Sequence, residues 1–296
     1  MNKAKLMFIC FLIPIVIASQ KNKKEDFSKY PLPNCVQLDS NLYCDRYEIT
    51  NFNWLEYLHW NKKIFGDHSL EYQAALPDSN VWLKLETPST FMVKKYLRSP
   101  VYRNYPVVGV TQQQARNFAA WRSDRVFEIY LIKTRTIREE KEQNAENYFT
   151  IKRYFQNQLN WAPRDSKIEH YPEYRLPNKN ERQKMLNHNQ SQNKALISAF
   201  AAEQHLTGQI GCDTCSVPPT VSVGNNNKKN SLWLYQLQGN VSEWLDELKQ
   251  IAGNNWRGVY KENQNEIWET HLAASAEIGF RCVAEWKKVT DCEKLD

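Results

Sequence analysis

A polar turn followed by an acid and a tryptophan is the stretch of this 296-residue chain with the clearest potential for chemistry. The sequence LYQLQGNVSEWL, residues 234–245, places a Gly-Asn turn signal between apolar residues and puts Glu243 directly before Trp244. A tight turn can aim backbone carbonyls at one point while a carboxylate supplies charge, and hard cations prefer such oxygen ligands. The alternative is a turn in which Asn240 and Glu243 hydrogen-bond to the backbone with no ion. The stretch therefore has two interpretations, an ion site and a structural turn.

Cysteine is the second residue type that could carry chemistry. Apart from Cys10, which lies in an N-terminal apolar run, the chain has six cysteines, Cys35, Cys44, Cys212, Cys215, Cys282 and Cys292. An even number in an exported chain predicts disulfides, and the short spacings favour three local bridges, 35–44, 212–215 and 282–292. The pair in CDTC could instead be a redox motif or half of a zinc site. Loop sequences flank it and no second CxxC exists, so a structural disulfide is the preferred interpretation.

Other catalytic patterns are missing from the sequence. It has no HExxH pair, no phosphate-binding GxxxxGK loop and no GxSxG nucleophile elbow. Its six histidines are scattered along the chain. The formal net charge of +6 is mild and spread out, which argues against nucleic-acid binding.

The N-terminus has the pattern of a secretory signal. Lys3 and Lys5 precede the apolar run LMFICFLIPIVIAS, which is short for a membrane span and ends in small residues. We expect a signal peptide over residues 1–19 and a charged, proline-broken tether over residues 20–33. The protein is then exported, to the periplasm, the outer membrane or the medium, with no membrane span after cleavage. An uncleaved anchor is the alternative.

Turn and capping signals mark the elements that must position these residues. The alternation in CVQLDSNLYCDRYEIT predicts a hairpin over residues 35–50. Thr50 could cap the helix NFNWLEYLHWNKK, in which Phe52, Leu55 and Leu58 share a face.

Further along the chain, YPVVGV at residues 105–110 is typical of a short buried strand. Capping boxes are expected where Thr111 precedes Gln114 and where Asn178 precedes Glu181. Residues 126–165 carry blocks of opposite charge and are expected to form a solvated helical insertion. EIGFRCVAEW, residues 277–286, predicts one closing strand. Because strands and helices do not alternate regularly, the predicted fold class is α+β rather than a parallel sheet.

Five pieces of sequence occur in a distinctive order, YCDRYEITNFNWLEYLHW, YPVVGVTQQQARNFAAW, YRLPNKNER, LYQLQGNVSEW and IGFRCV. In this order they resemble the formylglycine-generating enzyme family, also called the sulfatase-modifying-factor domain. The resemblance implies a loop-rich α+β variant of the C-type lectin fold over residues 34–296, stabilised here by the expected disulfides. The segment that begins WRSDRVFEIYLI also resembles a branch found among gliding-motility and type IX secretion lipoproteins.

The resemblance implies a calcium site at the Gly-Asn turn. Glu243 would supply the carboxylate, and Gln238, Gly239 and Val241 would supply backbone oxygens, with Trp244 packed beneath. We therefore expect calcium as a structural cofactor. One departure from the resembled family lies nearby, because Arg182 stands where an aromatic residue is expected after RLPNKNE.

The resemblance also implies a copper site, which this sequence cannot build in the usual place. Catalytic members of the resembled family hold copper through two cysteines between the Glu-Trp element and the closing Gly-Phe-Arg strand, because soft Cu(I) needs thiolates. Residues 245–278 contain no cysteine, and Cys282 lies inside the closing strand. We therefore expect no copper and no copper-dependent oxidase activity.

These observations predict an exported binding or structural component of the cell envelope. Its expected partner is another envelope protein, in a gliding or type IX secretion assembly. Candidate partner contacts are the aromatics of the variable stretch, Trp256, Tyr260 and Trp268. The alternative is an oxidase or peptide-maturation factor of the same family that uses residues other than cysteine.

Overall fold

The structure is a computed structural model that describes residues 31–192, 219–224, 234–257 and 268–292. Its helices are α1 (Asn51–Phe65), α2 (Leu70–Ala75), α3 (Thr90–Lys95), α4 (Gln112–Lys133), α5 (Ile151–Phe155), α6 (Lys179–Gln192) and α8 (Val289–Cys292), with 3-10 turns η2 (Ser79–Leu83) and η3 (Pro100–Tyr102). Its strands are β1 (Cys35–Gln37), β2 (Tyr43–Asp45), β3 (His170–Arg175), β4 (Ser242–Trp244), β5 (Gln250–Ala252), β6 (Trp268–Thr270), β7 (Ile278–Gly279) and β8 (Val283–Lys288).

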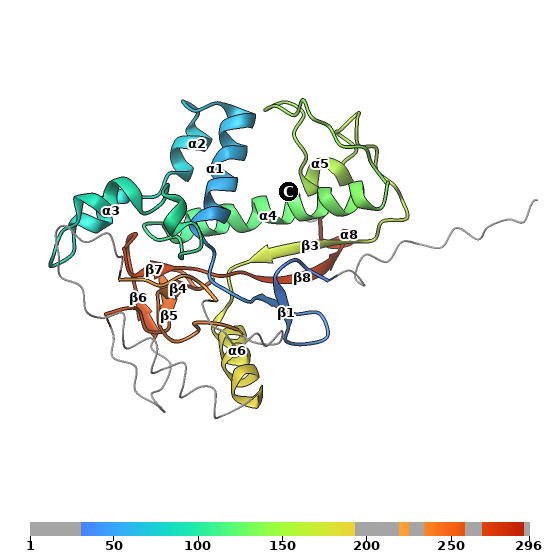
Figure 1. Ribbon diagram of the computed structural model, residues 1–296. Helices are drawn as coiled ribbons and strands as arrows, with labels where there is room; N and C mark the ends of the chain where they lie inside the picture. The colour runs from blue at the N-terminus through green and yellow to red at the C-terminus, as the bar shows by residue number, and fades with distance from the viewer. Residues whose placement is uncertain (1–30, 193–218, 225–233, 258–267, 293–296) are drawn as a thin grey trace, which may run out of the picture.

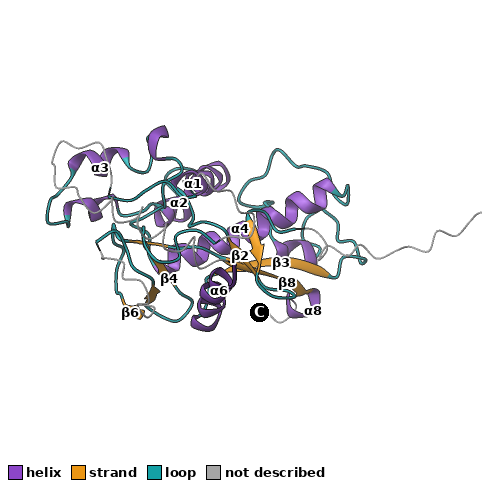
Figure 2. Ribbon diagram, turned by 60° about the horizontal axis from the view of Figure 1, so that its bottom comes forward, coloured by secondary structure: helices purple, strands orange, loops and turns teal. Residues whose placement is uncertain are grey.

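Two small four-stranded sheets and one long helix organise these elements (Figure 1). The first sheet has the order β1-β2-β8-β3 and is antiparallel throughout. The second has the order β6-β5-β4-β7, with β4 and β7 parallel. Helix α4 packs along β3, while α6 lies on the other side of the first sheet (Figures 1 and 2). This mixture of helices and mainly antiparallel sheets confirms the predicted α+β class.

The predicted hairpin forms, but the disulfide expected to close it does not. The register of β1 and β2 pairs Cys35 with Asp45 and Val36 with Cys44. Because successive residues of a strand point to opposite faces, the two thiols lie on opposite sides of the hairpin. The Cys35 thiol lies 3.7 Å from Asp45 Oδ1, whereas Cys44 is buried with Val36. The predicted 35–44 bridge is therefore wrong.

The bridge expected at the end of the chain is also wrong. Cys282 comes directly before β8 and Cys292 ends α8, which follows that strand. The six residues of β8 span roughly 20 Å, far beyond the Cα separation that a disulfide allows. Cys282, Cys35 and Cys44 are free thiols. The predicted 212–215 bridge lies outside the described residues, and no disulfide is found among the residues that the structure describes.

Two capping boxes fix the helices that carry the core. Thr50 and Asn53 form a reciprocal box at the start of α1, and Thr111 and Gln114 form one at the start of α4. The Trp54 ring of α1 stacks on Phe118 of α4, with centroids 5.4 Å apart. The buried face of α1 differs from the expected one, because it is formed by Trp54, Tyr57, Leu58, Asn61 and Ile64.

The segment over residues 126–165 differs from the expected solvated insertion. Helix α4 ends at Lys133, and apart from the single turn of α5 the segment is irregular. Its aromatic residues form core, since Phe127 lies 6.1 Å from Phe149 and 5.6 Å from Tyr154 between ring centroids. The charged residues form only short blocks, and the burial of the aromatic side chains makes this segment part of the core.

The stretch expected as a strand at residues 105–110 is buried but irregular. Val107 N donates to Ile49 O at 2.8 Å, yet no regular strand pairing follows. Gly109 has a φ of 75°, and a Cβ there would lie 2.5 Å from Asp78 O. The close approach of that carbonyl and the positive φ interrupt the extended backbone.

The closing stretch forms two strands instead of one. β7 pairs with β4 in the second sheet, while β8 pairs with β2 and β3 in the first. Residues 280–282 therefore pass from one sheet to the other. Arg281, at the centre of this passage, is completely buried.

Within the described residues, no helix is long and apolar enough to cross a membrane.

Candidate functional site

The Gly-Asn turn predicted from the sequence is held by side chains on both sides. Gly239 and Asn240 both have positive φ, 132° and 60°. The Asn240 amide donates to Glu48 Oε1 at 2.9 Å. Directly after the turn, β4 is buried along its whole length, and Trp244 Nε1 donates to Val110 O at 2.9 Å.

Glu243 lies between two arginines in the interior. Arg182 Nη1 donates to Glu243 Oε2 at 2.6 Å, and Arg281 Nη2 donates to Oε1 at 2.6 Å. The Nε of Arg281 lies 2.9 Å from both carboxylate oxygens. All three side chains are completely shielded from solvent. Both oxygens of this carboxylate are therefore engaged by charged donors of the protein.

Arg281 connects this cluster to the first sheet. Its Nη2 also donates to Tyr235 O at 2.7 Å, and its Nη1 lies 3.3 Å from Asp45 O. Burial alone would lower the pKa of Arg281, but the adjacent Glu243 carboxylate raises it above its usual range. The guanidinium therefore stays charged and joins the turn, β2 and the passage between β7 and β8.

Glu48 is a second buried acid beside the same cluster. Burial raises its pKa to about 8, against the lowering influence of the Arg281 guanidinium. Its Oε1 accepts from Asn240, while its Oε2 has no hydrogen-bond partner among the described residues. Glu48 is therefore protonated at neutral pH, and nothing in the sequence pattern singled it out.

A calcium ion at the site expected on Gln238, Gly239, Val241 and Glu243 would compete with arginine side chains for the Glu243 carboxylate. Glu243 is the only charged ligand of that set, and guanidinium groups occupy both of its oxygens. Arg182 Nη2 also donates to the Leu237 carbonyl, at the start of the same turn. As placed, these residues do not fit a calcium ion bound through Glu243. Calcium binding itself stays a prediction.

The cysteines that the structure describes as free thiols, Cys35, Cys44 and Cys282, lie outside the interval where the resemblance places the copper ligands. The interval between Leu245 and Ile278, where the resemblance places the copper cysteines, has none in its sequence. Cys282 is buried in the passage between the sheets, and its N–H donates to Asp45 Oδ2 at 2.9 Å. Burial, and then the nearby Asp45 carboxylate, raise the pKa of the Cys282 thiol well above its usual range. It is therefore a protonated core residue.

The aromatics expected at a partner interface lie in different surroundings. Trp256 is half-buried against an apolar cluster around Val81, and its Nε1 donates to Ala276 O at 3.1 Å. Trp268 lies on the outer strand β6, where its ring is 36% exposed and faces the Lys179 ammonium at 5.6 Å. Tyr260 lies outside the described residues. A contact role for these residues stays a prediction.

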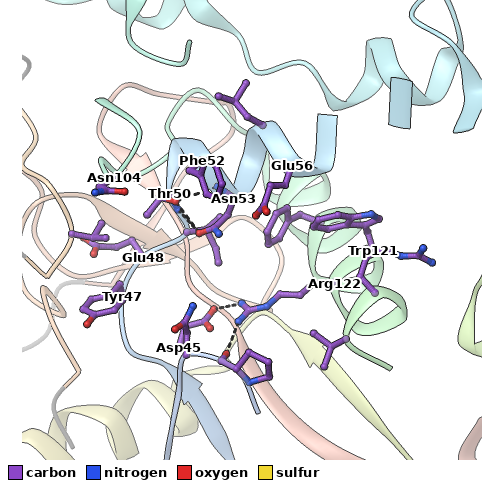
Figure 3. A pocket seen from close by; sticks show the side chains of 18 of the residues that line it. Asp45, Tyr47, Glu48, Thr50, Phe52, Asn53, Glu56, Asn104, Trp121 and Arg122 are labelled. Atoms are coloured by element: carbon purple, nitrogen blue, oxygen red, sulfur yellow. Dashed lines mark hydrogen bonds and ion pairs between the residues drawn. The ribbon is translucent and has the colours of Figure 1, made fainter. Parts of the chain in front are cut away.

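A groove between α1, α4 and the segment after β2 is a feature that the sequence did not reveal (Figure 3). Its volume is about 970 Å³, within the range of ligand and peptide clefts. One wall comes from α1, with Phe52, Glu56 and Trp60, and another from α4, with Arg122 and Ile129.

The groove combines exposed apolar surface with fixed charges. Phe52 is 45% and Ile129 48% exposed, high values for such side chains. At its floor, Arg122 donates to Asp45 Oδ2 at 2.7 Å and to Pro33 O at 3.1 Å (Figure 3). Glu56 is exposed on the wall above this pair. The surface can therefore accept an apolar side chain next to a charged one.

One sequence signal could have located the groove. Phe52 falls outside the spacing of the buried positions in α1, which are Asn51, Trp54, Tyr57, Leu58, Asn61 and Ile64. An aromatic residue off the buried face of an amphipathic helix is exposed, and exposed aromatics commonly contact partners.

Comparison with known proteins gives a family and a distant structural neighbour. The family model described as Sulfatase-modifying factor enzyme 1-like domain matches residues 18–286. No curated protein matches the chain. Among solved structures, the crystal structure of CarF is similar with a TM-score of 0.43 and 17% identity, covering 82% of this chain and 86% of that chain.

Proposed function

Because the chain belongs to the family of sulfatase-modifying factor enzyme 1-like domains, we propose that it is an exported, non-catalytic member that acts by binding in the cell envelope. The observation that carries this proposal is the set of thiols. Residues 245–278 contain no cysteine, and the nearby Cys282 is buried and protonated. A soft copper ion needs thiolates, so the family's oxidation chemistry has no ligands in its usual place.

With the copper ligands missing from their usual place, the groove between α1 and α4 supports binding as the activity of this protein. It presents Phe52 and Ile129 to solvent on walls made of two regular helices anchored by capping boxes. Rigid walls favour recognition because little conformational entropy is lost on binding. The occupant that fits is an extended protein segment that places apolar side chains against Phe52 and against Ile129 and a basic side chain near Glu56.

The proposed partner is an envelope protein, in a gliding or type IX secretion assembly. Two features of the sequence support this choice, the signal-like N-terminus and the resemblance of the segment after Trp121 to lipoproteins of such assemblies. In this proposal calcium is not required for the groove, since Glu243 belongs to the buried cluster instead.

A site-specific crosslinking experiment tests the proposal. A photoreactive phenylalanine analogue replaces Phe52 in the full chain, expressed in the cells that produce it. The matched control places the same analogue at Leu70, which is 84% exposed on α2 and does not line the groove. We expect position 52 to crosslink one defined envelope protein that position 70 does not. The same products at both positions, or none at position 52, would contradict the groove as the binding surface.

A second measurement addresses the enzymatic alternative. Purified protein is incubated with copper and a cysteine-containing peptide while oxygen consumption and peptide mass are followed. We expect neither oxygen uptake above the buffer blank nor a change in peptide mass. Oxidation of the peptide at a rate that depends on the protein would show a maturation enzyme that uses residues other than a cysteine pair.

A further inference from the structure

Arg182 lies between two oxygens that both belong to the Gly-Asn turn region. Its Nη1 donates to Glu243 Oε2 at 2.6 Å, after the turn, and its Nη2 donates to Leu237 O, before the turn. The side chain is completely buried and reaches these oxygens from helix α6. One guanidinium therefore joins the two ends of the turn.

The start of α6 is built to aim this side chain inward. Asn178 and Glu181 form the predicted reciprocal capping box, with both hydrogen bonds at 2.9 Å. Arg175 then clamps the Glu181 carboxylate with two bonds of 2.7 and 2.6 Å and also binds Glu285 of β8. Because Glu181 is held against the first sheet, the side chain of the next residue, Arg182, extends from α6 toward the Gly-Asn turn.

The backbone opposite leaves room for the guanidinium. Gly253 has a φ of 83°, and a Cβ there would lie 2.8 Å from Arg182 Nη2 and 2.9 Å from Leu237 O. Both separations are shorter than normal contacts of a Cβ atom, so the guanidinium and the carbonyl fill the space beside Gly253. The pocket around Arg182 therefore fits its charged head closely.

A carboxylate oxygen and a backbone carbonyl directed at one point are the ligands that a hard cation uses. A guanidinium satisfies the same two oxygens with charge-assisted hydrogen bonds, and as part of the chain it cannot dissociate. We propose that Arg182 is the built-in cation of this turn, and that Arg182 and a calcium ion are alternative occupants of the same position.

The charges around Glu243 also indicate that Arg182 and a calcium ion cannot occupy this position together. Glu243 already faces two guanidinium groups, those of Arg182 and Arg281. The other nearby acid, Glu48, is protonated at neutral pH. A calcium ion added beside Glu243 would place four positive charges around one carboxylate in a site without solvent, which strongly disfavours binding.

Thermal unfolding with and without calcium tests the proposal. For the wild type we expect the same melting temperature in millimolar calcium and in EDTA. For Arg182→Ala we expect a melting temperature lower by about 10 °C in EDTA, because Glu243 and Leu237 O lose a buried partner. Calcium should raise the melting temperature of this variant by at least about 4 °C, while magnesium should not.

Matched variants separate replacement of a cation from general destabilisation. Arg175→Ala removes another arginine from the start of α6 and should lower the melting temperature without creating a calcium response. Arg182→Ala combined with Glu243→Gln should lose the calcium response. If Arg182→Ala does not fold in EDTA, refolding in calcium and in magnesium replaces the melting measurement, with recovery only in calcium expected.

A wild-type melting temperature that rises in calcium would overturn the proposal. So would an Arg182→Ala variant that neither melts higher nor refolds in calcium, or a calcium response that persists in the double variant. These outcomes do not bear on the groove, which the crosslinking experiment tests separately.

Discussion

Arg122 Nη1 lies 2.7 Å from Asp45 Oδ2, and this ion pair fastens the end of β2 to the side of α4. Asp45 is 3% exposed and also accepts from Cys282 N, so its charge is balanced mainly by Arg122. The Arg122 guanidinium lies 4.2 Å from the ring centre of Tyr174 as well. The pair therefore forms the floor of the groove and links its walls to the first sheet.

Breaking this pair should destabilise the protein strongly. We expect Arg122→Met to lower the free energy of unfolding by about 3 kcal/mol, because a buried carboxylate loses its partner. Adding Asp45→Asn should recover part of the loss, since a neutral amide needs no counter-charge. Urea denaturation measures both changes.

A control for that experiment is Lys184→Met, which breaks the exposed pair with Asp39 at 2.7 Å. It should leave the denaturation midpoint nearly unchanged, because exposed ion pairs contribute little. Equal effects of the two substitutions would contradict a structural role for the Arg122–Asp45 pair.

The buried acid Glu48 predicts a specific pH dependence. Its pKa is about 8 in the folded protein and 4.5 as an unperturbed group, so the folded state keeps a proton that the unfolded state releases. The free energy of unfolding should therefore fall as pH rises from 4.5 to 8, by up to about 1.4 kcal/mol per pH unit from this group. Above pH 8 this contribution should level off.

Glu48→Gln tests that assignment. The amide stays neutral at every pH and keeps an oxygen for the Asn240 donor, so stability should fall less steeply between pH 5 and 8. At pH 8 the variant should be more stable than the wild type. Glu71→Gln, at an exposed position of α2, is the control and should keep the wild-type slope. A wild-type slope in Glu48→Gln would place the titrating group elsewhere.

Local signals in the sequence located element starts but not the pairing between elements. The boxes at Thr50, Thr111 and Asn178 form because each depends on residues within one turn. The prediction of a 35–44 disulfide was wrong because the spacing of two cysteines does not determine the strand register. The register decides on which face of the hairpin each thiol lies. A shift of one residue reverses the face, so a spacing argument cannot decide it.

The candidate site shows the same limit. The turn, Glu243 and the unusual Arg182 can all be identified from the sequence. Arg182, however, lies in a different stretch of the chain from the turn and Glu243. Their contact depends on how α6 and β4 approach each other, which is a tertiary relationship. The groove was missed for the same reason, since the starts of α1 and α4, Asn51 and Gln112, are 61 residues apart in the sequence.

Gly253 offers a test of the close packing around Arg182. Gly253→Ala should lower the free energy of unfolding by about 2–4 kcal/mol, combining the strain of a positive φ with a Cβ pressed against Arg182 and Leu237 O. Gly66→Ala is the matched control, because Gly66 has a φ of 92° but nothing within 4 Å of the added Cβ. It should cost less, on the order of 1 kcal/mol, from the strained backbone conformation alone. If urea denaturation gives the two variants equal losses, the guanidinium does not fill the space beside Gly253.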